Sequence, residues 1–133
     1  NINFDPDTSL SFEGESGPYL QYCAVRAKSI LEKAKGLGMQ ADSRMEKGVT
    51  NNIEKLLAQF PSVVEQALSE WAPHYVTTYL LSLAQEFNSW YGNMKIVDQE
   101  NPDSGYNIAI TESVSNVLRN GLALLGMEAP EKM

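Results

Sequence analysis

The chain has 133 residues, of which 43% are hydrophobic, and its formal net charge is −7. One domain with one sizeable core is expected at this length. The negative charge argues against a domain that grips DNA or RNA by bulk electrostatics, but it allows one that reads a few bases by stacking. The single cysteine, Cys23, excludes an internal disulfide framework and fits a reducing compartment such as the cytoplasm. No apolar run is long enough to cross a membrane.

The N-terminal quarter is predicted to be an irregular segment followed by a helix. Residues 1–16 hold a proline, a glycine and several acids, so we expect no regular structure there. Gly17 and Pro18 then open a helix, because proline suits the first helical position. Gly36 and Gly38 are typical of its end. The apolar residues at helical spacing between these limits are Leu20, Ala24, Ala27, Leu31 and Ala34.

Two short helices are expected next. Residues 39–50 are polar and predict a loop, and Thr50 or Asn51 is a suitable cap for the second helix. Pro61 is expected to end that helix, because a proline in a helix interior removes a backbone donor. A third helix then carries apolar residues from Val63 to Trp71.

The C-terminal half predicts two longer helices. The fourth helix spans roughly residues 73–94 and has the clearest periodicity, with Tyr79 among its core positions. Residues 99–105 are a loop by composition. The last helix has core positions from Ile110 onward and stops at Gly126. Five helices and no credible strand predict an all-α fold, a single helical bundle of about five helices.

Groups that carry catalysis are scarce. The one histidine, His74, follows Pro73 at a helix start, where a surface or partly packed position is expected. Cys23 lies near the core positions of the first helix and is expected to be a small buried hydrophobe. One cysteine and one histidine do not make a zinc site, and no phosphate-binding glycine motif or nucleophile elbow occurs. We therefore predict that this chain alone has no catalytic residue, no metal site and no cofactor.

A second stripe of side chains lies on the first predicted helix. At about 100° per residue, Tyr22 and Arg26 fall within about 60° of Tyr19 and away from the apolar positions. These side chains either pack against the N-terminal segment or form a surface on which single-stranded bases stack. A peptide-binding surface would also use tyrosine and arginine. The pattern alone leaves these alternatives open.

Four motifs follow one another along the chain: LSFEGESGPYLQYCAVRAKSIL, FPSVVEQAL, PHYVTTYLLSLAQEFNSWYGNMKIV and, at the end, VLRNGLALLGMEAPEKM. Together they resemble the C-terminal, DALR-type anticodon-binding domain of arginyl-tRNA synthetase, a class I synthetase domain. The similarity covers about residues 10–133. It implies an all-α bundle over residues 17–133, preceded by a junction from the catalytic domain.

The resemblance also implies a function. In the family this domain holds the anticodon loop of the arginine tRNA, and an upstream catalytic domain of the same polypeptide makes arginyl-adenylate from arginine, ATP and Mg²⁺. The signature of that catalytic domain is absent here. We therefore expect a cytoplasmic tRNA-binding piece of an arginine–tRNA ligase, with no DNA or membrane partner. The alternative is a helical protein-interaction module that binds no RNA, which the acidic charge favours.

The family's anticodon contacts match five residues of this chain. They are Tyr19 and Tyr22 of the GPY-x-QY motif, Arg26 four residues further on, Tyr91 at the end of FN-x-x-Y, and the terminal Met133. Residues 11–16 correspond to a loop that shapes the family's anticodon pocket.

Two of these matches have structural alternatives, and two positions depart from the family pattern. Tyr91 would otherwise pack in the core beside Trp90, and Met133 would otherwise be a frayed end. Asn107 and Ser115 stand where the family often has arginine. Their loss puts in doubt a phosphate contact or a helix-locking pair at those positions.

Overall fold

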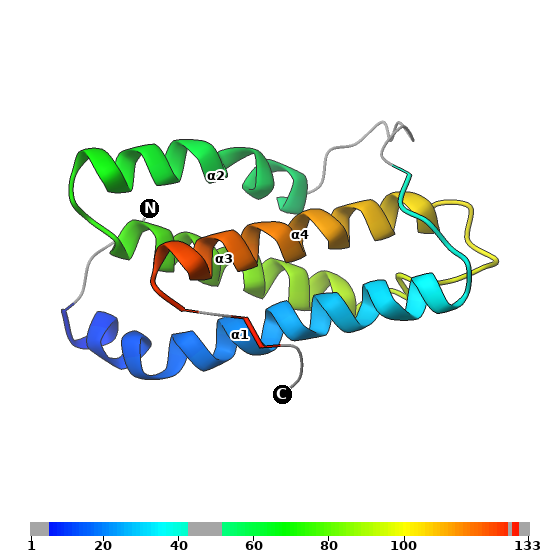
Figure 1. Ribbon diagram of the computed structural model, residues 1–133, viewed down its shortest axis with the longest axis horizontal. Helices are drawn as coiled ribbons and strands as arrows, with labels where there is room; N and C mark the ends of the chain where they lie inside the picture. Colours follow the sequence, from blue (N-terminus) through cyan, green and yellow to red (C-terminus); the bar gives the residue numbers. More distant parts are fainter. Residues whose placement is uncertain (1–5, 43–51, 128, 131–133) are drawn as a thin grey trace.

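The computed structural model describes residues 6–42, 52–127 and 129–130, with side chains from residue 16 onward. It contains four helices, α1 (Pro6–Gly36), α2 (Asn52–Ser69), α3 (His74–Gly92) and α4 (Ser104–Leu124). Successive helices alternate in direction along the long axis of the molecule (Figure 1). The predicted all-α bundle is confirmed, and none of the described segments forms a strand.

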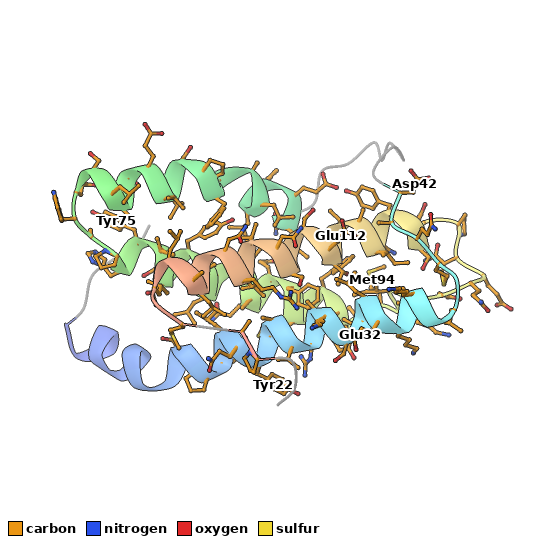
Figure 2. All side chains as sticks on the ribbon, in the orientation of Figure 1. Tyr22, Glu32, Asp42, Tyr75, Met94 and Glu112 are labelled. Carbon is orange, nitrogen blue, oxygen red and sulfur yellow. The ribbon has the colours of Figure 1, made fainter. Side chains whose placement is uncertain are left out.

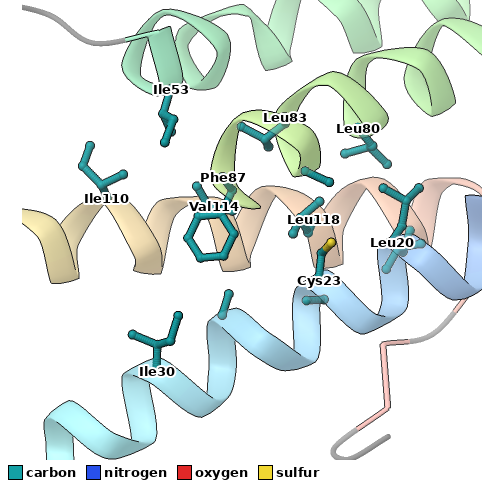
Figure 3. Packing of buried hydrophobic residues seen from close by; sticks show 14 of the residues in the cluster. Leu20, Cys23, Ile30, Ile53, Leu80, Leu83, Phe87, Ile110, Val114 and Leu118 are labelled. Carbon is teal, nitrogen blue, oxygen red and sulfur yellow. The ribbon is translucent and has the colours of Figure 1, made fainter. Parts of the chain in front are cut away.

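Buried apolar side chains from all four helices form one core. α1 packs chiefly along α4, and α2 packs chiefly along α3, while α3 and α4 contact every other helix. Figure 3 shows Cys23 of α1 and Phe87 of α3 beside Leu118 and Val114 of α4. All four side chains are fully buried. The periodicity of the first and fourth predicted helices therefore identified the buried faces of α1 and α3 correctly.

The predicted break at Pro61 is wrong, because α2 runs through it from Asn52 to Ser69. A proline in a helix interior costs about 3 kcal/mol relative to alanine. Phe60 and Val63, on either side of it, pack against the core, and burial of this apolar face offsets the cost. Two predicted helices are therefore one. The predicted caps, Thr50 and Asn51, lie outside the described residues.

The helix predicted to start at Gly17 and Pro18 begins earlier, at Pro6, so residues 6–16 are helical and Pro18 is internal. Ser16 and Gly17 are buried, and a side chain at residue 17 would collide with the methyl group of Met127. The C-terminal segment thus covers α1 at this point. Contact with a segment more than 100 residues away is invisible to a local proline rule.

Glycines end two of the helices as predicted. Gly38 after α1 and Gly126 after α4 have φ angles of 72° and 76°, a conformation that glycine adopts without strain. Each precedes a residue whose N–H closes the helix end, as in the 2.8 Å bond from Met127 to the Leu122 carbonyl. Trp71 takes the same position after α2 with a φ of 52° and is 92% exposed.

Gly121 of α4 packs directly against Leu80 of α3, and we expect Gly121→Ala to destabilise the fold. A Cβ there would lie 2.6 Å from both methyl groups of Leu80, which is fully buried. Overpacking costs about 1–3 kcal/mol, whereas alanine in a helix regains at most about 1 kcal/mol. Chemical denaturation should show a lower free energy of unfolding. The matched control is Gly92→Ala, whose Cβ meets nothing within 4 Å, and equal stability of the two variants would contradict the prediction.

Tyr79 is in the core as predicted, and its burial makes the fold sensitive to alkali. The side chain is 3% exposed, its hydroxyl donates to the Leu56 carbonyl at 2.5 Å, and burial raises the pKa of Tyr79 to about 12. The folded state favours the neutral phenol, so this contribution to the free energy of unfolding is fully present below about pH 10. As the pH rises from about 10 to 12 the contribution is lost, which lowers the free energy of unfolding by roughly 2–3 kcal/mol. The difference in Tm between the parent and Tyr79→Phe should therefore narrow as the pH rises over this range, as measured by thermal unfolding. A constant difference would contradict it.

Candidate nucleic-acid interface

Four side chains from α1 and α3 come together on one face of the bundle. Tyr19, Tyr22 and Arg26 project from α1, and Tyr91 projects from the last turn of α3. The guanidinium carbon of Arg26 lies 4.9 Å from the ring centroid of Tyr22 and 5.1 Å from that of Tyr91. One cation thus links an aromatic ring on each helix. Figure 2 shows Tyr22 on the outer side of α1.

Asn88 of α3 holds this arrangement from below. Its Oδ1 accepts a 2.8 Å hydrogen bond from Nη1 of Arg26, and its Nδ2 donates to the hydroxyl of Tyr19 at 2.8 Å and to Sγ of Cys23 at 3.3 Å. Because arginine can only donate, the oxygen of the amide must face Arg26 and the nitrogen must face the phenol and the thiol of α1. One amide therefore fixes both ends of the cluster.

Arg26 has a second anchor on its own helix. Its Nη2 donates to the hydroxyl of Tyr22 at 3.0 Å, four residues away and therefore on the same helix face. The guanidinium is held by Asn88 on one side and Tyr22 on the other. Its orientation is set before any ligand arrives, which reduces the conformational entropy lost on binding. We refer to Tyr22, Arg26 and Tyr91 below as the ring–cation–ring surface.

Burial changes the acid–base behaviour of the groups beneath this surface. Burial raises the pKa of the Tyr19 phenol, and the hydrogen bond from Asn88 partly opposes this rise. Burial likewise raises the pKa of the Cys23 thiol, again opposed by Asn88. Both groups are therefore neutral near pH 7. Cys23 is fully buried, which confirms the prediction of a small buried hydrophobe rather than a reactive thiol.

The two outer tyrosines remain accessible. Tyr22 is 48% exposed and Tyr91 is 39% exposed, so Tyr91 lies at the surface and the alternative of core packing beside Trp90 is wrong. Its inner side rests on Phe87, at 6.4 Å between ring centroids. The rings are thus supported from within and open to solvent. Such an arrangement can stack against a planar ligand, while neighbouring N–H and O–H groups reach its edges.

The other predicted positions are distributed as follows. Met133 lies outside the described residues. Residues 11–16 belong to α1 rather than to a loop. Asn107 and Ser115 are buried, at 1% and 4% exposure, so neither faces the ring–cation–ring surface or solvent. His74 is partly buried, as expected, with its ring 4.6 Å from that of Tyr75.

Sequence reasoning missed Asn88, although the signal was present. Asn88 lies three residues before Tyr91 within the same FN-x-x-Y motif, and residues three apart share a helix face. A polar residue behind a predicted aromatic contact indicates a hydrogen-bonding support. What the motif lacks is the partner, because Tyr19 and Arg26 are more than 60 residues away.

The described part of the chain shows no grouping of three or more His, Cys, Asp or Glu side chains suited to a metal ion. Among the described helices, none is both long and apolar enough to span a membrane. The side chains of the interface offer stacking, hydrogen bonding and local positive charge.

We expect Asn88→Ala to loosen the cluster without unfolding the chain. Removing an amide that serves three partners should lower the free energy of unfolding by about 1–3 kcal/mol. It should also raise the pKa of Cys23 further, since the hydrogen bond from Asn88 lowers it. The Cβ chemical shift of this sole cysteine, followed by NMR against pH, measures the second effect. The control is Asn93→Ala, whose amide bonds only to the Ser89 carbonyl of its own helix; equal effects in both variants would contradict the role of Asn88.

Comparison with known proteins identifies the family. Residues 20–133 match the DALR anticodon binding domain. The chain is 43% identical over 133 residues to "Arginine--tRNA ligase 1" of Bacillus cereus, covering 100% of this chain and 24% of that protein. It is 40% identical over 136 residues to "Arginine--tRNA ligase" of an Exiguobacterium species, covering 100% of this chain and 23% of that protein.

A solved structure agrees. Arginyl-tRNA synthetase of Thermus thermophilus matches with a TM-score of 0.67 and 33% identity, over 99% of this chain and 24% of that one. The chain thus spans about a quarter of the length of the curated relatives it matches. These matches confirm the resemblance inferred from the four motifs. The chain belongs to the DALR anticodon-binding domain family.

Proposed function

We propose that this domain binds the anticodon loop of the arginine tRNA and positions that tRNA for aminoacylation by an arginine–tRNA ligase. The observation that carries the proposal is the ring–cation–ring surface, held open and pre-oriented by Asn88 on a domain of the DALR family. The bases of an anticodon loop are unpaired, so they are accessible to aromatic side chains in a way that bases in a duplex are not.

The physics of stacking suits an acidic domain. Each base stacked on an aromatic ring contributes about 1–3 kcal/mol and needs little net positive charge. Tyr22 and Tyr91 offer the stacking faces, and Arg26 offers charged donors for base edges between them. Tyr19 lies deeper, where its ring supports the surface and reaches a base that enters between the helices. Met133 remains a predicted contact by resemblance to the family.

The remaining activity belongs to the rest of the ligase in this proposal. The catalytic domain lies upstream in the same polypeptide and forms arginyl-adenylate from arginine, ATP and Mg²⁺, while this domain contributes recognition and no catalytic group. The relatives that support this are named arginine–tRNA ligases. A cytoplasmic location follows from the place of protein synthesis and fits an unpaired cysteine.

A binding titration tests the proposal directly. The ligand is the anticodon stem-loop of the arginine tRNA, compared with the same stem carrying a scrambled loop, at two salt concentrations. We expect a preference for the arginine loop that persists when overall affinity falls with salt. The measurement is repeated with the domain inside the complete ligase. Equal affinity for both loops in the isolated chain and in the ligase would overturn the proposal, as would binding that is insensitive to salt.

Tyr22→Ala should weaken binding of the arginine loop by about 1–3 kcal/mol, roughly 5- to 150-fold in Kd, because one stacked base loses its platform. The fold should persist, since half of the Tyr22 side chain is exposed. Tyr22→Phe retains the ring but loses the hydroxyl that accepts from Arg26, and we expect a smaller loss.

The control for this series is Trp71→Ala, which removes an exposed aromatic ring at the α2–α3 turn. It should leave Kd unchanged. If Tyr22→Ala binds as tightly as the parent, or if Trp71→Ala weakens binding equally, Tyr22 does not stack on a base.

A further inference from the structure

Cations continue the line of the ring–cation–ring surface along α1. Lys33 follows Arg26 by seven residues, which places it on the same helix face and about 10 Å further along the axis. Lys95 comes three residues after the end of α3. Both side chains are exposed, and neither has an ion-pair partner among the described residues. This is a local concentration of positive charge in a chain whose net charge is −7.

An open hollow joins these lysines to the proposed base-reading surface. Its volume is about 460 Å³, and its lining includes Lys33, Lys95, Tyr91, Met94, Ile96 and Val97. No aspartate or glutamate of the described residues lines it. Figure 2 shows Met94, one of the lining residues, beside the C-terminal half of α1, with Tyr22 nearer the N-terminal end of that helix. Tyr91 therefore belongs both to the ring–cation–ring surface and to the wall of the hollow.

We propose that this hollow binds the sugar-phosphate backbone of the RNA strand as it leaves the ring–cation–ring surface, with Lys33 and Lys95 on the phosphates. The inference rests on the proposed function and adds a second subsite to it. A strand whose base stacks on Tyr91 must carry its next phosphates past the same residue. The apolar floor of Met94, Ile96 and Val97 accommodates ribose, and the two ammonium groups at the rim meet the charge.

The position of Lys33 has a competing structural explanation, which the test must separate. Lys33 and Lys35 both lie in the last turn of α1, where a cation stabilises the negative end of the helix dipole. The two lysines point about 160° apart around the helix axis, and Lys35 is absent from the hollow. Glu32, the acid next to Lys33, lies about 100° away around the helix and does not line the hollow either.

The test measures the salt dependence of binding in charge-matched variants. Lys33→Gln, Lys95→Gln and the control Lys35→Gln each remove one positive charge, and the probes are the arginine anticodon stem-loop and its scrambled-loop counterpart. For a single strand, log Kobs falls with log salt, and each lost phosphate contact reduces the steepness of this fall by about 0.7. We expect that decrease, with several-fold weaker binding at low salt, for Lys33→Gln and for Lys95→Gln but not for Lys35→Gln. The preference for the arginine loop should stay at the parent value.

Each remaining outcome overturns the proposal. If the slopes of Lys33→Gln and Lys95→Gln match that of Lys35→Gln, the lysines contribute only general charge, and the proposed function stands without this subsite. If either variant loses the preference between loops, the lysine reads a base rather than the backbone. If the parent shows no preference and no salt dependence in the ligase, the proposed function fails first and the subsite fails with it.

Discussion

The side-chain amide of Asn88 is the contact on which the surface of this domain depends. It lies between α1 and α3 and satisfies a guanidinium on one side and a phenol and a thiol on the other. Arginine has many rotamers, and ordering it costs entropy. The hydrogen bonds from Arg26 to Asn88 and to the Tyr22 hydroxyl offset that entropy within the folded domain. The two outer rings are then presented in one arrangement, on helices that the core already holds in place.

The proposed binding of RNA is physically consistent with an acidic domain when recognition is local. Arg26 and Lys33 share one face of α1, and Lys95 lines the same hollow as Lys33 and Tyr91, so positive charge is concentrated beside the aromatic rings. The rest of the molecule repels a polyanion at long range. Such a domain binds where rings and cations coincide and discourages non-specific adhesion elsewhere. A negative net charge is therefore compatible with selective binding of bases.

Local patterns predicted most of the fold, and they were wrong where long-range packing outweighs a residue's own preference. The apolar spacing of residues 73–94 identified α3, and Gly38 and Gly126 identified two helix ends. Pro61 and Pro18 were read as boundaries but lie inside helices. Phe60 and Val63 beside Pro61 are partly buried against the core, and Gly17 beside Pro18 is buried. In both places the free energy of burial exceeds the cost of one missing hydrogen bond.

The sequence by itself determined that the chain is helical and that Tyr19, Tyr22 and Arg26 share one face of a helix, because helical spacing is a property of consecutive residues. Only the tertiary structure decided that Asn88 and Tyr91 meet that face. The two sets of residues lie on α1 and α3, and no pattern of neighbouring residues predicts that they come into contact. Their alignment depends on how Cys23 and Phe87 pack in the shared core. Side-chain packing at close to crystal density fixes the relative position of two helices, and no pattern along one helix contains that information.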